Sequence, residues 1–373
     1  MFQLVRTLLV CGGLVTVGAY VFAAEEAAPH LVSNAVWVLK KLDVNAAPPI
    51  TLDVGTTGKV SATNGLPSSS ISGLAEDKDG AIWIVHGGLS RLVGDQLCNY
   101  SVQRQGKELF FATSPTVGAS GLWFLPEGSE PIICRRTADG IELRQYENVV
   151  DADLGRLVSC IFVDSRGCTW WGGYRDSIWQ VQDERVSLIQ RCTSRHSSIV
   201  AIGESPSGQV LFGTTSASFY SFDPDDRWFP EEMRLPTLYY IDRLTSFCFD
   251  QLGNLYVAGM GQRVVRVEGI LATRLLQTSD VVEVDDLVPK VNLDRNENVW
   301  ICSTGEAICI HAPRYDKSTE YHFADSPIIR QVLVDSSGNY WAATNKGVLK
   351  NFHKMMGVTV EESHLPEVMR PRK

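Results

Sequence analysis

The sequence lacks the motifs that mark the most familiar catalytic and metal sites. It has no CxxC pair, nucleophile elbow, HExxH motif or phosphate-binding loop. A basic excess is also missing, because 34 Lys and Arg stand against 43 Asp and Glu, for a formal net charge of −9. Binding to nucleic acid or to an anionic lipid surface needs a cationic face, so neither is expected. We also expect no metal and no cofactor.

Long apolar runs are scarce, and the one that is present lies at the N-terminus. Arg6 is followed by apolar or small residues over 8–24, and charge returns at Glu25. This order predicts a secretory signal peptide over residues 1–24. An uncleaved anchor is the alternative, because the run is near the minimum length of a membrane span, and it would be the only membrane contact. Both outcomes predict a periplasmic or secreted protein of the bacterial cell envelope.

The nine cysteines do not form the dense pattern of a small disulfide-stapled domain. Removal of the signal peptide takes Cys11 and leaves eight, an even number that permits disulfides in an exported protein. Most of them lie among apolar residues, where a free cysteine behaves as a small hydrophobic side chain. Cys302 and Cys309 could face each other across one hairpin, and the pairing stays open.

A repeated turn is what the sequence has in abundance. Asp-x-x-Gly, or a weaker form of it, precedes an apolar and usually aromatic segment seven times, with turn positions at 80, 121, 167, 208, 253, 297 and 338. The spacing is 41 to 46 residues. Asp can accept a hydrogen bond from its own downstream backbone and Gly allows positive φ, so each copy predicts a hairpin turn. The clearest copies are 77–83, 164–170 and 335–341, and the poorest is 118–124.

Each unit offers an apolar strand before the turn, an aromatic strand after it, a third strand and a less regular fourth. Four short antiparallel strands in about 43 residues are typical of a propeller blade. We predict an all-β fold, a single, monomeric seven-bladed β-propeller of four-stranded antiparallel blades over residues 50–360. Residues 25–49 are expected to be an N-terminal extension or linker and 361–373 a loose tail. The two chain ends together must complete one blade. The candidates for its closing outer strand are 50–54 with 59–62 from the N-terminal side and 356–360 from the C-terminal side, and the choice stays open.

The stretches 64–74, 77–83 and 88–91 together resemble the repeat of bacterial two-component regulator propellers, with further good copies at 157–179 and 327–350. This resemblance implies a periplasmic or extracellular sensing propeller. In that family such modules often precede a membrane span and a kinase. Here 35 residues follow the last turn and hold no second apolar span. We therefore expect a stand-alone module without a kinase.

A ligand site is expected at one end of the central channel, opposite the Asp-x-x-Gly turns. The loops that lead into each innermost strand, and those that join the second and third strands, would supply His86, Arg156, Tyr174, Arg175, Arg195, His196, Tyr240, Asp242, Arg243, Asp286, Asp325 and Arg330. Mixed charge with aromatic walls would suit a sugar, a peptide or a small anionic ligand. The alternative is a set of solvated loops over a narrow, water-filled channel.

These features favour an exported ligand-binding or sensor module whose partner is a small polar ligand or another envelope protein. One alternative is a protein-interaction scaffold, which predicts an exposed apolar patch. A less favoured alternative is a propeller lyase or hydrolase, in which His86 or His196 would act as a general base beside a carboxylate. No catalytic residue is assigned.

Overall fold

The computed structural model describes residues 37–52, 58–137, 140–148, 158–182, 184–190, 197–223, 227–234, 243–260, 263–268, 277–283 and 289–364. The strands all belong to one compact unit, Leu31–Lys373. The predicted signal peptide lies outside the described residues. Within them, no helix has the length and apolar character that a membrane crossing requires.

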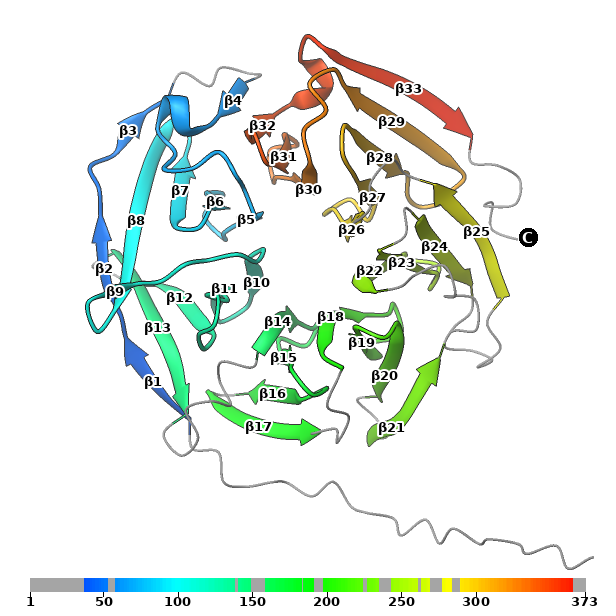
Figure 1. Ribbon diagram of the computed structural model, residues 1–373, viewed down its shortest axis with the longest axis horizontal. Helices are drawn as coiled ribbons and strands as arrows, with labels where there is room; N and C mark the ends of the chain where they lie inside the picture. The colour runs from blue at the N-terminus through cyan, green and yellow to red at the C-terminus, as the bar shows by residue number, and fades with distance from the viewer. Residues whose placement is uncertain are drawn as a thin grey trace, which may run out of the picture. The chain divides into compact units, whose positions relative to one another are not determined.

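The described strands form seven antiparallel sheets, arranged in chain order round a common axis (Figure 1). Sheet 1 contains β2 (Asp43–Ala46), β3 (Ile50–Thr51), β5 (Gly73–Glu76), β6 (Ile82–Val85), β7 (Leu89–Val93), β8 (Gln96–Arg104) and β9 (Lys107–Glu108). Sheet 2 contains β1 (Trp37–Lys41), β10 (Thr116–Gly118), β11 (Gly121–Phe124), β12 (Ile132–Thr137) and β13 (Gly140–Asn148). Sheet 3 contains β14 (Val158–Val163), β15 (Thr169–Gly173), β16 (Ile178–Gln182) and β17 (Arg185–Gln190).

The remaining sheets repeat this plan. Sheet 4 contains β18 (Ile199–Glu204), β19 (Val210–Thr214), β20 (Ser218–Asp223) and β21 (Arg227–Arg234), and sheet 5 contains β22 (Leu244–Phe249), β23 (Leu255–Gly259), β24 (Arg263–Glu268) and β25 (Gln277–Glu283). Sheet 6 contains β26 (Lys290–Leu293), β27 (Val299–Cys302), β28 (Glu306–Ile310), β29 (Lys317–Phe323) and β33 (Val358–His364). Sheet 7 contains β30 (Ile329–Val334), β31 (Tyr340–Thr344), β32 (Gly347–Lys350) and β4 (Gly58–Val60). The prediction of an all-β propeller is confirmed.

The N-terminal strands join three different sheets. β1 pairs with β13 in sheet 2, β2 and β3 pair with β8 in sheet 1, and β4 pairs with β32 in sheet 7. The segment expected to be a linker, 25–49, thus contributes strands to two sheets. Sheet 7 is completed from the N-terminal side by Val60, a fully buried residue opposite Val348. β33 from the C-terminal side extends sheet 6 instead.

Apolar clusters fill the space between neighbouring sheets, because one sheet cannot bury both of its faces alone. Trp83 of sheet 1 lies 5.4 Å from Phe124 of sheet 2, measured between ring centroids. A further cluster joins Trp341 of sheet 7 to Ile84 of sheet 1. The repeated aromatic residues are therefore core residues, as the pattern predicted.

The turn glycines adopt the backbone that the repeat predicted. Gly80 and Gly338 have φ of 78° and 77°, a region that favours glycine. Glu297 takes the same place with φ 62°. The proposed facing of Cys302 and Cys309 is wrong, because the strand register sets them opposite Ala307 and Trp300, respectively, and both thiols are free.

Candidate functional site

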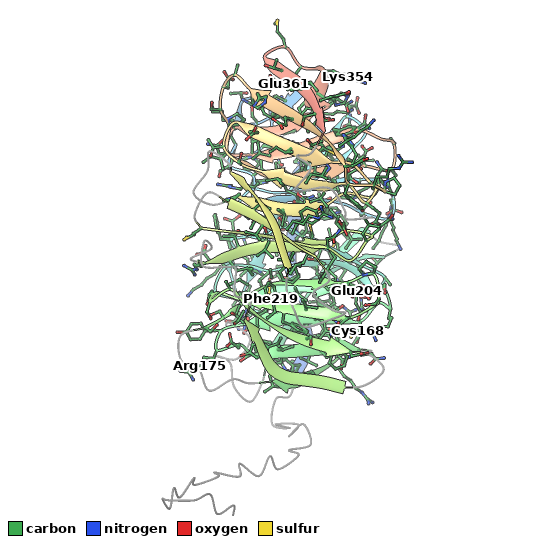
Figure 2. The ribbon with its side chains drawn as sticks, turned by 90° about the vertical axis from the view of Figure 1, so that its right-hand side faces the viewer. Cys168, Arg175, Glu204, Phe219, Lys354 and Glu361 are labelled. Atoms are coloured by element: carbon green, nitrogen blue, oxygen red, sulfur yellow. The ribbon has the colours of Figure 1, made fainter. Side chains whose placement is uncertain are left out.

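Each sheet presents two ends, which we call the turn end and the loop end. The turn end carries the Asp-x-x-Gly turns. The loop end carries the loops into the innermost strands and those between second and third strands. Figure 2 shows Cys168 and Glu204 on one side of the molecule and Arg175 on the opposite side.

At the loop end, neighbouring sheets are tied together by isolated β-bridges. Gly87 of sheet 1 pairs with Phe111, which precedes β10 of sheet 2, and Tyr174 of sheet 3 pairs with Ser198, which precedes β18 of sheet 4. Thr304 and Ile328 repeat this arrangement between sheets 6 and 7. The bridges fix these loops against one another at three junctions, and we call the described loops of this end the preformed rim.

Large apolar side chains are exposed around this rim. Phe110, Tyr174, Met260 and Ile328 have exposed fractions of 58%, 45%, 38% and 39%. They come from loops of four different sheets. These side chains are therefore accessible to a ligand or partner.

Four of the predicted site residues lie on this rim and are exposed: Tyr174, Arg175, Arg243 and Asp325. Arg175 has φ 56°, an uncommon conformation for a residue with a side chain. A cavity of about 140 Å³ opens beside Asp325 and Lys346. Six further predicted residues lie outside the described residues, namely Arg156, Arg195, His196, Tyr240, Asp242 and Asp286.

His86 is placed differently from the exposed residues. Its side chain is 6% exposed, and its Nε2 lies 2.7 Å from the Ser90 hydroxyl, which donates to Asn99 Oδ1 at 2.6 Å. Burial lowers the pKa of His86, so the imidazole is neutral near pH 7. This network fixes the hairpin of β6 and β7, and a structural role accounts for the histidine.

Arg330 belongs to a set of innermost-strand residues that bind the next sheet. Its Nη1 donates to the carbonyl of Ile71, at 2.8 Å, and to the Ser70 hydroxyl. Thr245 occupies the same bulge position in sheet 5 and donates to the Pro289 carbonyl at 2.8 Å. Arg330 therefore links sheet 7 to sheet 1 at the channel.

The turn end is organised by buried aspartates. Asp335 accepts hydrogen bonds from the backbone N–H groups of Ser337 and Asn339, from the Asn339 amide and from Trp341 Nε1. The ring donors of sheets 1, 3, 5 and 6 bond to their own turn aspartates in the same way. Burial would raise the pKa of Asp335, but these hydrogen bonds prevail and hold it below the usual range.

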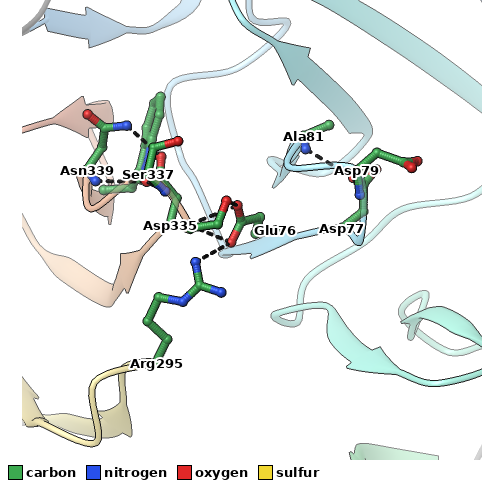
Figure 3. A network of polar contacts seen from close by, with 10 residues as sticks. Glu76, Asp77, Asp79, Ala81, Arg295, Asp335, Ser337 and Asn339 are labelled. Carbon is green, nitrogen blue, oxygen red and sulfur yellow. Dashed lines mark hydrogen bonds and ion pairs between the residues drawn. The ribbon is translucent and has the colours of Figure 1, made fainter.

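A second carboxylate clasps adjacent sheets at two junctions. Glu204 of sheet 4 accepts from the backbone N–H and hydroxyl of Ser165 of sheet 3, both at 2.7 Å. Glu76 of sheet 1 accepts from the backbone N–H of Ser336 of sheet 7 at 2.9 Å, and Arg295 of sheet 6 joins it (Figure 3). We call this arrangement the junction clasp.

Two cavities open at the turn end where sheet 2 meets its neighbours. One, of about 200 Å³, lies against the turn of sheet 1, and one of about 500 Å³ lies against the turn of sheet 3. Both are bordered by Ala119, Ser120 and Arg135. The sequence predicted no site at this end. The feature that could have indicated one is the poor match of residues 118–124 to the repeat.

Within the described ranges, one group of side chains could hold a metal ion. Ligand atoms of Glu306, Glu320 and His322 lie within 4.8 Å of one another. Each carboxylate faces a different ring nitrogen of His322, at 3.5 and 3.6 Å. Both ring nitrogens of His322 thus face a carboxylate, and we assign no metal to this group.

Comparisons with known proteins agree with the fold. Residues 65–88 match the family described as two component regulator propeller. No curated protein matches the chain in sequence. A streptogramin B lyase structure is 14% identical with a TM-score of 0.60, over 87% of this chain and 98% of the lyase.

Two other propeller structures are similar. The extracellular domain of a candidate hybrid two component system from B. thetaiotaomicron is 15% identical with a TM-score of 0.56, covering 82% of this chain and 41% of that one. YCF48 bound to D1 peptide is 13% identical with a TM-score of 0.53, covering 81% and 96%. At these identities the likeness shows the fold alone.

Proposed function

We propose that this protein is an exported, sensor-type recognition module, a seven-bladed propeller in which each sheet is one blade and the loop end binds a small polar ligand. The preformed rim carries the proposal, since exposed Tyr174 and Arg175 stand on loops that are bridged to the next sheet. A fixed aromatic face and a guanidinium suit sugars and peptide groups, because one stacks and the other donates paired hydrogen bonds.

Two observations support this proposal over a lyase, although the fold itself is shared by an extracellular two component domain and by a streptogramin B lyase. The short match at residues 65–88 is to a sensor-associated repeat. His86, one of the two predicted bases, is buried against Ser90 rather than facing a carboxylate on the rim. The likeness to one extracellular domain, together with the short repeat match, also supports an envelope location.

A thermal-shift screen against mono- and oligosaccharides and short peptides tests the proposal. The informative variant is Tyr174→Ala with Arg175→Gly, because glycine accepts the positive φ of position 175. Leu252→Ala, an exposed turn-end residue, is the matched control. We expect a compound that raises Tm in wild type and control but not in the rim variant.

Two results would contradict the loop-end site. One is a shift that is equal in all three proteins. The other is no shift with any compound alongside capture of an envelope protein, which would favour the scaffold alternative.

A further inference from the structure

The junction clasp is missing where sheet 1 meets sheet 2. Val117 of sheet 2 is equivalent to Glu76 of sheet 1, because each directly precedes the first residue of its turn. In the strand register, Val117 pairs with Leu122 and Glu76 pairs with Ile82. Val117 is 51% exposed. Lys78 of sheet 1 is equivalent to Ser336 of sheet 7, whose backbone N–H donates to the clasp glutamate Glu76. Among the described residues, no acceptor bonds the backbone N–H of Lys78.

The aspartate of the turn is missing at the same place. Gly118 stands where five of the other turns have Asp and sheet 4 has Ser205, and a Cβ at Gly118 would lie 3.3 Å from Trp123 Nε1. That indole nitrogen is buried and has no hydrogen-bond partner in the described part of the chain, whereas Trp341 Nε1 lies 2.8 Å from Asp335. Sheet 2 thus lacks the turn aspartate and, like most of the sheets, the clasp glutamate. Lys78 borders the cavity toward sheet 1, whereas Trp123 borders the cavity toward sheet 3.

A cavity of about 200 Å³ lies at this position, which we call the turn-end cavity. Four cationic side chains and two carboxylates border it, namely Lys78, Arg91, Arg135 and Arg136 with Asp77 and Asp79. The local charge is positive, although the whole chain carries −9. Lys78 forms no ion pair within the described residues, and Arg135 bonds to Glu184, a half-exposed residue, at 2.6 Å.

We propose that the turn-end cavity binds a carboxylate of an external ligand in the place that Glu76 and Glu204 occupy at their own junctions. The carboxylate accepts from the Lys78 backbone N–H, as Glu204 accepts from that of Ser165 at 2.7 Å. The Lys78 ammonium and the Arg135 guanidinium supply charge-assisted contacts. This site is separate from the loop end and does not depend on the proposed function.

A pair of substitutions at the exposed Val117 tests the proposal. Val117→Glu places a carboxylate in the clasp position, so it competes with the ligand and restores the bond to sheet 1. Val117→Gln has the same size without the charge. Binding is measured by calorimetry with two probes, glutarate and a glutamate-rich hexapeptide. We expect at least a tenfold loss of affinity with Val117→Glu, a raised Tm, and little change with Val117→Gln.

Glu184→Gln provides the opposite test, because it releases Arg135 for the ligand. We expect affinity to increase about threefold, and the increase should shrink as salt is added. If the hexapeptide binds more tightly than glutarate, the ligand carboxylate belongs to a polypeptide. If glutarate binds more tightly, the ligand is a small acid. Equal affinities of Val117→Glu and Val117→Gln, or no binding of either probe to the wild-type protein, would overturn the proposal.

Discussion

The turns of sheet 7 and sheet 2 have the same position in the fold but different residues. Asp335 joins its own turn to Trp341, whereas Gly118 leaves Trp123 Nε1 without a partner. Glu76 clasps sheet 7 to sheet 1, whereas Val117 leaves the next junction open. The comparison teaches that these carboxylates act as structural acceptors where they are present. At the junction of sheets 1 and 2, where they are absent, the Lys78 N–H has no acceptor among the described residues and lies beside a cavity.

The largest effect is expected from Asp335→Ala. Four donors that now bond to this carboxylate would lose their acceptor, and unsatisfied buried donors are costly. The free energy of unfolding should fall by about 2 to 4 kcal/mol. Urea unfolding measures it, with Glu127→Ala, an exposed residue, as the control. A loss no larger than that of the control would show that the aspartate turn is not a stabilising element.

A smaller effect is expected from Ser205→Ala in sheet 4, where serine replaces the turn aspartate. The Ser205 hydroxyl accepts from the backbone N–H of Gln209 at 3.1 Å, and Leu211 replaces the aromatic donor. One neutral hydrogen bond is worth about 1 kcal/mol, so urea unfolding should show a loss of that order. If the free energy of unfolding fell as much as in Asp335→Ala, the aspartate turn would be no more stabilising than the serine turn.

Much of this organisation could be predicted from the sequence because it is local. The Asp-x-x-Gly turns and the aromatic that follows need only neighbouring residues, so the propeller fold was predictable. The completion of sheet 7 by β4 was one of the two expected alternatives. The pairing of β1 with sheet 2 and of β2 with sheet 1 was not predictable, since these short strands lie outside the repeat. The same holds for the clasp, because Glu76 and Ser336 are 260 residues apart and meet only in the folded ring.

The candidate site was only partly predictable. Tyr174 and Arg175 lie on exposed loops as expected, because loop position follows from the repeat phase. His86 lies in the loop where the repeat spacing places it, but its side chain is buried against Ser90. That contact depends on the direction of the side chain within one hairpin, which the spacing does not specify. The turn-end cavity was not predictable. It lies where Val117 and Gly118 provide no carboxylate to residues far away in the sequence, and a local pattern carries no information about such contacts.

The smallest expected effect is a difference in acid sensitivity between two turns. The folded-state pKa of Asp335 is lowered, so its stabilising contribution is present above the unfolded pKa and is lost as pH falls through the folded one. Burial raises the pKa of Asp250, so proton uptake there favours the folded state as pH falls. Unfolding free energies from pH 6 to 3 should therefore decline less steeply for Asp335→Asn than for wild type, and more steeply for Asp250→Asn. Parallel curves for all three proteins would contradict these assignments.

The backbone amide of Lys78 offers the most direct test that the junction of sheets 1 and 2 binds a ligand carboxylate in the way that two other junctions bind Glu204 and Glu76. In a ¹⁵N-resolved NMR titration with glutarate, we predict that the Lys78 amide shifts downfield and saturates, while the amides of Ser165 and Ser336, already bonded to Glu204 and Glu76, stay in place. An unmoved Lys78 amide at a glutarate concentration that shifts other residues would contradict the account.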